Sequence, residues 1–319
     1  MNDSKISVVI PLYNKAGTIK RCLDSVLAQT SAPHEVIVLD DGSQDTGLAR
    51  AKQYQAQHPE LNLRVLVQSN QGVAAARNAA IKAASCDYIA LLDADDTFEP
   101  EFISEIKTLI CSFRNARVFC TRYTMQYQDG SQRRAKWQGI RQMPKRGLMQ
   151  RYFKMAANGD LPISASSVCI HKDAIKRAGG FPYGQQMGED QWLWSVLALN
   201  ETIAYSSRSL ATYYAQVTDS LMQSLVPNQE LPYSAMLQDL VDTRTFSYPL
   251  KRDIRAMIRT HLYDLVRRNF LSQQPHVCDY LLQDHRLQSW RLRTLYWRIK
   301  LHASRFTQRV NTSTLDYKA

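Results

Sequence analysis

Short runs of apolar residues alternate with amphipathic segments along the first hundred residues of the chain. The runs predict strands buried on both faces, because each is almost continuously apolar and is bounded by turn-forming or polar residues. These strands are expected at Ile6–Pro11, Glu35–Leu39, Leu63–Val67 and Tyr88–Leu92. The segments between them have helical spacing and cover about Ala16–Gln29, Leu48–His58 and Val73–Ala84. The alternation predicts an α/β fold with a Rossmann-like, mostly parallel sheet flanked by helices.

The pattern is weaker between Phe98 and Ser164 and becomes regular again further on. We expect, in order, a helix at Pro100–Arg114, mixed segments at Val118–Tyr127, a basic loop at Arg133–Lys136, a strand at Ser166–Ile170, a turn at Gly179–Pro182 and a helix at Trp192–Leu199. From about Leu231 onward the spacing of apolar residues is helical. We therefore expect one α/β domain over residues 1–225 and a basic, mainly helical C-terminal region over residues 226–319.

Charge supports this division. The chain of 319 residues has a formal net charge of +11, from 40 Lys and Arg against 29 Asp and Glu. Residues 251–319 contain 14 of the basic residues and 5 of the acidic ones, a net charge of +9, so the rest of the chain is nearly neutral at +2. Two parts with different roles are expected.

Composition narrows the class of protein. A chain that is 45% hydrophobic and 22% charged is typical of a folded, water-soluble protein. No run of residues approaches the eighteen or so apolar positions of a membrane span, and the N-terminus lacks an export signal, so we expect a cytoplasmic location. The six scattered cysteines include no Cys-x-x-Cys pair, and we expect them to be reduced thiols of the core.

Acidic and polar residues follow three of the four predicted strands, at Pro11–Asn14, Asp40–Ser43 and Asp93–Asp96. The carboxyl ends of parallel strands lie along one edge of a sheet, where ligands of such folds bind. Clustered carboxylates there are typical of a Mg²⁺ or Mn²⁺ site completed by the phosphates of a substrate. The alternative is structural, since acids after a strand also cap helices and shape turns.

Two further features have the same two interpretations. Arg77, near the start of a predicted helix, is either a solvated surface cation or a partner for phosphate or carboxylate. Glu189 and Asp190 either favour the first turn of the helix that follows them or supply a catalytic carboxylate. The residues alone leave both questions open.

Taken together, these stretches resemble the family 2 glycosyltransferases, which are inverting enzymes of the GT-A fold. The stretches that carry the resemblance are Val8–Asn14, Val38–Asp45, Asn70–Gly72, Ala76–Asn78, Leu91–Asp96, Gly179–Phe181 and Glu189–Asp190. The resemblance implies a nucleotide-binding half over residues 1–100 and an acceptor-binding half over 101–225. It also implies transfer of a sugar from a nucleotide-diphosphate sugar, with a UDP-sugar as the favoured donor, to a hydroxyl of a saccharide or lipid-linked acceptor, as in the synthesis of bacterial surface polysaccharide.

Site residues follow from the same resemblance. It assigns the nucleotide sugar to Pro11, Tyr13, Asn14, Asp40, Asp41, Gly72, Arg77, Asp93 and Ala94. It makes Asp95 the ligand of a divalent cation, Mg²⁺ or Mn²⁺, which would offset the charge of the departing diphosphate. It makes Asp190, with Glu189 beside it, the general base that takes the proton of the acceptor hydroxyl.

One motif departs from the family pattern. Relatives often have a Tyr-Tyr-Arg-x-His stretch whose His reaches the metal, whereas this chain has Tyr213-Tyr214-Ala215-Gln216-Val217. The loss implies fewer protein ligands for the metal, weaker metal binding or, as a further alternative, an inactive enzyme.

The C-terminal region has seven Lys or Arg residues and no acid between Arg286 and Arg309, interleaved with aromatic residues. This composition suits a helix lying on an anionic membrane, so residues 251–309 are expected to place the protein peripherally on the cytoplasmic face of the inner membrane. Ordinary packing with a solvated basic face and nucleic-acid binding are the alternatives.

Two alternative functions are open to the whole chain. A nucleotidyltransferase of sugar phosphates would need a basic, glycine-rich loop after the first strand, and Pro11–Lys15 is not one. A non-enzymatic, basic nucleic-acid-binding protein would show binding that weakens steeply with salt and does not depend on a metal.

Overall fold

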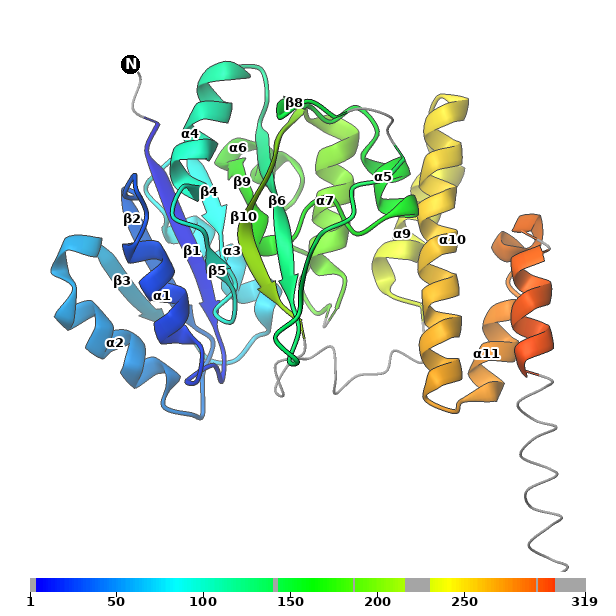
Figure 1. Ribbon diagram of the computed structural model, residues 1–319, viewed down its shortest axis with the longest axis horizontal. Helices are drawn as coiled ribbons and strands as arrows, with labels where there is room; N and C mark the ends of the chain where they lie inside the picture. Colours follow the sequence, from blue (N-terminus) through cyan, green and yellow to red (C-terminus); the bar gives the residue numbers. More distant parts are fainter. Residues whose placement is uncertain (1–3, 140–142, 186, 216–229, 291, 302–319) are drawn as a thin grey trace, which may run out of the picture. The chain divides into compact units, whose positions relative to one another are not determined.

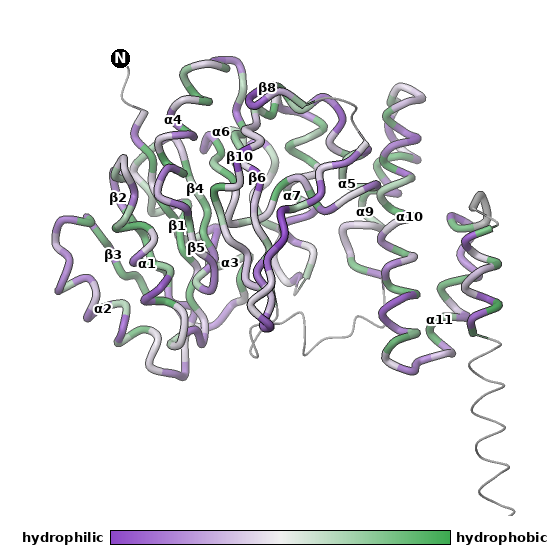
Figure 2. The backbone as a smooth tube through the Cα atoms, in the orientation of Figure 1, coloured by the Kyte–Doolittle hydropathy of each residue, from purple (hydrophilic) through white to green (hydrophobic). Residues whose placement is uncertain are grey.

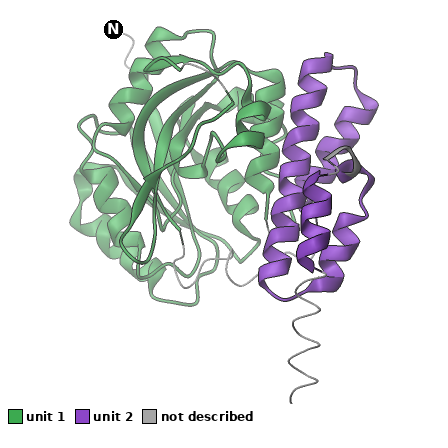
Figure 3. Ribbon diagram, turned by 45° about the vertical axis from the view of Figure 1, so that its right-hand side comes forward, with its two compact units in different colours: residues 1–219 green, residues 220–319 purple. Residues whose placement is uncertain are grey.

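The computed structural model describes residues 4–139, 143–185, 187–215, 230–290 and 292–301. The chain divides into two compact units, unit 1 at Met1–Asp219 and unit 2 at Ser220–Ala319 (Figure 3). The boundary that we predict between residues 225 and 226 falls in the stretch 216–229, outside the described residues, and stays a prediction.

Unit 1 is built on one mixed sheet of ten strands (Figure 1). Its first four strands run parallel in the order β3-β2-β1-β4, at Leu63–Val67, Glu35–Asp40, Ile6–Leu12 and Tyr88–Leu91. The sheet continues through β9, β6, β10 and β5, at Val168–His171, Val118–Gln126, Ile203–Tyr214 and Thr97–Phe98. Two short strands, β7 at Gln132–Arg134 and β8 at Arg146–Leu148, pair with β6 and β10. Antiparallel β9 joins the parallel half to β6.

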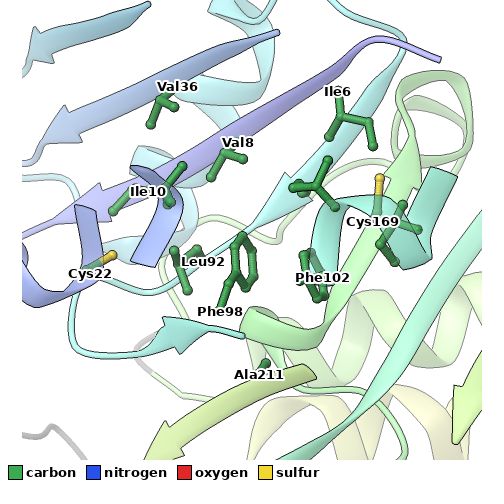
Figure 4. Packing of buried hydrophobic residues seen from close by; sticks show 14 of the residues in the cluster. Ile6, Val8, Ile10, Cys22, Val36, Leu92, Phe98, Phe102, Cys169 and Ala211 are labelled. Carbon is green, nitrogen blue, oxygen red and sulfur yellow. The ribbon is translucent and has the colours of Figure 1, made fainter. Parts of the chain in front are cut away.

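Helices cover both faces of this sheet. They are α1, α2, α3, α4, α5, α6 and α7, at Ile19–Leu27, Gly47–Gln57, Val73–Ala83, Phe102–Ser112, Tyr152–Asn158, Lys172–Arg177 and Glu189–Asn200, with single turns of 3₁₀-helix, η1 and η2, at Pro59–Leu61 and Ala165–Ser167. The α1, α2 and α4 side chains share one buried cluster with alternate residues of β1. Figure 4 shows Ile6, Val8 and Ile10 of β1 in this cluster, with Cys22 of α1 and Phe102 of α4. Helix α3 packs against β1 and β2 without joining that cluster, so it covers the opposite face.

The core follows from the apolar runs of the sequence. All six residues of β2 are buried, and so are six of the seven of β1. Hydrophobic residues therefore run along the central strands, between more polar helix surfaces (Figure 2). Fully buried strands of this kind are stable only between two layers of helices, which is the reason for the three-layer arrangement.

Unit 2 is helical in its described part. It contains α9 at Pro232–Thr243, α10 at Tyr248–Leu271, α11 at Pro275–Leu282, η3 at His285–Trp290 and a helix at residues 292–301. The apolar side chains along one face of α10, from Ile254 to Val266, are buried. Burial lowers the pKa of His261, on the same helix, to about 4, and its Nε2 accepts a hydrogen bond from the Leu231 amide. Among the described helices, none is both long enough and apolar enough to cross a bilayer.

The predicted α/β fold with a mostly parallel, helix-flanked sheet and a helical C-terminal region is confirmed. Several local expectations are wrong. Strand β3 lies at the edge of the sheet, and only Leu63 in it is buried, so it is not buried on both faces. Arg133 and Arg134, expected in a loop, belong to β7, and Ser166 and Ser167, expected in a strand, belong to η2. The last predicted helix of unit 1 begins at Glu189 and not at Trp192, because Gly188 adopts a left-handed conformation (φ 82°) and starts the helix before its apolar residues. All six cysteines are free, but Cys111 is exposed near the end of α4, so it is not a core thiol.

Candidate active site

The carboxyl ends of β1, β2 and β4 lie side by side, as the sequence predicts. Residues Leu12 and Asp40 are paired in the register of β1 and β2, and Val9 is paired with Leu91 of β4. The polar residues that follow the three strands therefore lie along one edge of the sheet. This edge is where a parallel α/β sheet binds its ligands.

The carboxylate of Asp41 organises the loop that precedes α3. Its Oδ1 accepts hydrogen bonds from the Gln71 amide (2.9 Å) and Gln68 Nε2 (2.7 Å), and its Oδ2 accepts one from the Gly72 amide (2.8 Å). Gly72 has φ 89°, a conformation that side chains disfavour. Asp41 thus holds the loop before α3 in place, whether or not a ligand also contacts it.

In the neighbouring Asp40, one carboxylate oxygen has a hydrogen-bond partner in the protein and the other has none among the described residues. Oδ2 accepts a hydrogen bond from the Ser43 amide (3.1 Å), whereas Oδ1 is buried with no hydrogen-bond partner among the described residues. A buried, unpaired carboxylate oxygen is costly unless a ligand supplies a donor.

The loop after β1 is held to the loop after β2. Asn14, in the left-handed region (φ 51°), accepts a hydrogen bond from the Gln44 amide at Oδ1 (2.8 Å), and its own amide donates to Ser43 Oγ (3.0 Å). The Tyr13 ring beside it is 43% exposed, and Pro11 is partly buried. An exposed aromatic ring on a fixed loop is suited to stack on a base.

Arg77 joins two distant parts of the chain. Its guanidinium donates to Asp93 Oδ1 and to Glu189 Oε1, each at 2.7 Å, and lies 5.1 Å from the centre of the Phe181 ring. Burial disfavours the charge on Arg77, but the carboxylates of Asp93, Glu189 and Asp190 outweigh burial and raise its pKa. The arginine therefore connects the turn after β4 to the start of α7.

Hydrogen bonds to Ser166, in η2, hold the turn after β4 in place. The Ser166 hydroxyl donates to Asp96 Oδ2 and accepts a hydrogen bond from the Asp93 amide (3.1 Å). The other oxygen of Asp96 accepts one from the Tyr214 amide (3.0 Å). Burial, then the negative charges of Asp95 and Asp93, raise the pKa of Asp96 well above its ordinary value. Asp96 is thus a buried structural acid, and Ala94 beside it is buried as well.

Asp95 differs from the buried Asp96, because its side chain is about one-fifth exposed. Its carboxylate pairs with Lys15 Nζ at 2.8 Å, and its backbone carbonyl accepts a hydrogen bond from Arg21 Nη2 at 2.6 Å. Within the described residues, no three His, Cys, Asp or Glu side chains converge to form a metal cluster. One accessible carboxylate nevertheless suits Mg²⁺ or Mn²⁺, which use one or two protein carboxylates when substrate phosphates complete their coordination. The residues present therefore fit a cation that is held jointly with a diphosphate.

Asp190 lies in the first turn of α7. Its Oδ1 accepts a hydrogen bond from the Gln191 amide (2.7 Å). Burial, and then the negative charge of Glu189, raise its pKa to about 7, although the cation of Arg77 opposes the shift. A carboxylate with a pKa near neutrality is suited to accept a proton in a reaction.

Two motifs far apart in the sequence are joined by Asn78. Its side chain donates to the carbonyl of Phe181 (2.8 Å) and accepts a hydrogen bond from the Phe181 amide (2.9 Å). A Cβ at Gly180 would lie 2.9 Å from Asn78 Oδ1, and Gly180 has φ 74°, so a side chain there would be both strained and crowded. The Phe181 ring packs edge-on against Trp194 of α7 (6.0 Å between centroids). This contact links the turn to the helix that contains Asp190.

The structure thus brings the predicted site residues to one edge, with roles that the sequence does not distinguish. Three contributors were missed: Lys15, Ser166 and the clamping role of Asn78. A Lys after the first strand and a Ser in a 3₁₀ turn have no signal of their own in the sequence. In the departing motif, Tyr213 and Tyr214 belong to β10, and Gln216 and Val217 lie outside the described residues.

Comparison with known proteins gives the class and then the family. The fold matches S. aureus TarS (residues 1–349), solved in complex with UDP-GlcNAc, with a TM-score of 0.65, 21% identity and coverage of 93% of this chain and 88% of that one. It also matches a mannosyltransferase from Pyrobaculum calidifontis, PcManGT, solved with GDP-Man and Mn²⁺, with a TM-score of 0.59, 14% identity and coverage of 94% and 86%. These neighbours define a GT-A-like fold.

The family is shown by sequence. The model of glycosyl transferase family 2 matches residues 7–169, just over half of the chain, and the chain belongs to this family. An uncharacterised glycosyltransferase of Escherichia coli strain K12, YibD, is 38% identical over 108 residues, which cover 34% of this chain and 31% of that protein. The match spans about a third of the length of the curated relatives.

Proposed function

We propose that the protein transfers a sugar from a nucleotide-diphosphate sugar, a UDP-sugar in the first instance, to a hydroxyl of a saccharide or lipid-linked acceptor, with inversion at the anomeric carbon. The observation that supports this most directly is the bridge through Arg77, which sets the acidic turn after β4 beside a carboxylate whose pKa is near 7. Synthesis of a bacterial surface polysaccharide is the setting that we propose.

The donor would lie along the edge of the sheet. The unpaired Asp40 oxygen and the exposed ring of Tyr13 are available to the nucleoside, with Pro11, Asn14, Asp41 and Gly72 shaping the loops around it. Arg77 and Asp93 would lie beside the ribose and diphosphate. The resemblance to UDP-GlcNAc-bound TarS favours uridine, and the GDP-Man complex of PcManGT makes guanosine the alternative to test.

Asp95 would hold the divalent cation against the diphosphate. A cation there supplies positive charge to the leaving group as its bond to the sugar breaks. Because Lys15 already pairs with Asp95, the lysine would exchange this partner for the diphosphate when the cation binds. The protein would then keep the site neutral in both states.

Asp190 would accept the proton of the acceptor hydroxyl. A hydroxyl is a weak nucleophile, and a carboxylate that removes its proton as the new bond forms raises its reactivity. Attack from the side opposite the diphosphate inverts the anomeric centre in one step and needs no covalent intermediate. Glu189 would not take part in proton transfer, because its Oε1 accepts a charged hydrogen bond from Arg77.

The proposal is tested by calorimetry with UDP, UDP-sugars and GDP-sugars, with and without Mn²⁺. Asp95→Asn should abolish the metal-dependent part of donor binding. Asp190→Asn should retain donor binding and lose transfer, by a factor of about 10²–10⁴. Asp173→Asn, which changes an acid that is 70% exposed on α6, is the matched control and should leave both properties unchanged. Near-normal transfer by Asp190→Asn would disprove the assignment of the base.

A further inference from the structure

The helix at residues 292–301 in unit 2 exposes large apolar side chains on one face. Leu292, Leu295, Tyr296 and Ile299 have exposed fractions of 84%, 52%, 50% and 59%. Their spacing of three and four residues places them in a continuous stripe, which we call the apolar stripe. Side chains of this size are normally buried when a helix packs only against its own protein.

The opposite face of the same helix is anchored to unit 2. The Thr294 hydroxyl shares a hydrogen bond with Tyr263 Oη (2.8 Å), and Leu301 is only 3% exposed. The Trp297 ring packs against Phe270, with 5.6 Å between centroids. The helix is thus held in a fixed orientation by one face, and that orientation presents the apolar stripe to solvent.

Basic residues flank the apolar stripe on both sides. With about 100° of rotation per residue, Arg293 and Lys300 lie on one side of the stripe and Arg298 on the other. Lys300 Nζ is 4.9 Å from the centre of the Tyr296 ring, so its charge lies beside the stripe. The sequence has no acid between residues 286 and 309.

We infer that the apolar stripe docks on the surface of an anionic lipid bilayer. A stripe of Leu, Ile and Tyr bordered by Lys and Arg is the arrangement that lets apolar side chains enter the acyl boundary while the cations reach the headgroups. The net charge of +9 over residues 251–319 strengthens the attraction to anionic lipid.

A second copy of the chain is a less suitable occupant. A two-fold interface would place the same patch on both partners and bring the flanking cations, Arg293, Arg298 and Lys300, close to the flanking cations of the other copy. The repulsion between like charges would oppose that contact. The inference concerns unit 2 alone and does not depend on the proposed sugar transfer.

The test is co-sedimentation of the full chain with vesicles of phosphatidylcholine alone and with vesicles in which a third of the lipid is phosphatidylglycerol. We expect binding to the anionic vesicles, and binding that weakens as salt screens the charges. The triple variant Leu292→Gln, Leu295→Gln, Ile299→Gln keeps residues that favour a helix and should bind at least about tenfold more weakly, because each apolar side chain contributes appreciably on burial.

Matched controls separate the stripe from general effects. The pair Leu271→Gln and Tyr280→Gln removes exposed apolar side chains of unit 2 outside the stripe and should bind like the wild type. Equal sedimentation of the triple variant and the wild type would overturn the inference, and so would the absence of binding to anionic vesicles. A wild-type dimer in light scattering that the triple variant converts to a monomer would also overturn it, by assigning the stripe to self-association.

Discussion

Replacing Arg77 by Met should destabilise unit 1 strongly, because the change removes one cation and leaves two carboxylates unpaired. The Arg77 side chain is 5% exposed, Glu189 is 8% exposed and Asp93 is 28% exposed. Removing one partner of a buried ion pair costs about 3–5 kcal/mol. Water reaches Asp93 and screens part of its charge, so we expect a loss of about 3 kcal/mol, at the lower end of this range.

The assay is urea denaturation followed by tryptophan fluorescence, since Trp192 and Trp194 lie in α7 close to Glu189. A protein of ordinary stability, about 5–15 kcal/mol, should still fold with this loss, so the variant can be measured. The double variant Arg77→Met, Glu189→Gln should recover about 1 kcal/mol or more, because it removes one of the unpaired charges.

The matched control is Arg177→Met. Arg177 also lies 2.7 Å from a carboxylate, that of Glu201, but its side chain is 56% exposed, so the change should cost no more than about 1 kcal/mol. Our account of Arg77 would be refuted if Arg77→Met and Arg177→Met had equal free energies of unfolding, or if the double variant recovered nothing.

Three further predictions concern the site. Because Asp190, the base that we propose, must be ionised to accept a proton and its pKa is raised to about 7, kcat/KM should rise about tenfold per pH unit below pH 7 and level off above it; a profile flat from pH 5 to pH 8 would contradict this. Lys15→Met should strengthen Mn²⁺ binding to the nucleotide-free protein, measured by calorimetry, because the ammonium no longer competes for Asp95, whereas the exposed control Lys20→Met should not. Asn78→Ala should lower the free energy of unfolding by about 1–3 kcal/mol, because two backbone groups of the Gly-Gly-Phe turn lose their partners; an unchanged urea midpoint would show that water replaces the amide.

The sequence predicts the parallel half of the fold well, since strands buried on both faces leave a local signal. Strands β1 and β2 carry this signal. Strand β3 was also predicted, with its observed bounds Leu63–Val67, although it lies at the sheet edge and only Leu63 in it is buried. The insertion of antiparallel β9 between β4 and β6 was not predicted, because pairing between strands about eighty residues apart in the chain leaves no trace in either strand. The start of α7 was missed for a related reason: its first turn is polar, and periodicity detects only the apolar face.

The site shows the same limit. The residue types at Asp93, Asp95 and Asp190 indicate their chemistry, but the sequence cannot say which acids are available to a ligand. Asp96 and Asp95 are neighbours in the chain, yet Asp96 is buried against a serine, whereas Asp95 is partly exposed and paired with a lysine. Such differences arise from packing between segments and become visible only in three dimensions.

The hydrogen bonds of Arg77 and Asn78 to the second half of unit 1 limit the exchange of sequence segments between related enzymes. These two consecutive residues of α3 hold Glu189 and Phe181, which belong to the half of unit 1 expected to select the acceptor. A chimera could join residues 1–100 of this chain to the second half of another enzyme. In it, Arg77 and Asn78 would keep their partners only if the other enzyme supplies equivalents of Glu189 and Phe181. A change of acceptor preference therefore requires exchanging residues of the second half together with the residues of α3 that contact them, and not one contiguous segment alone.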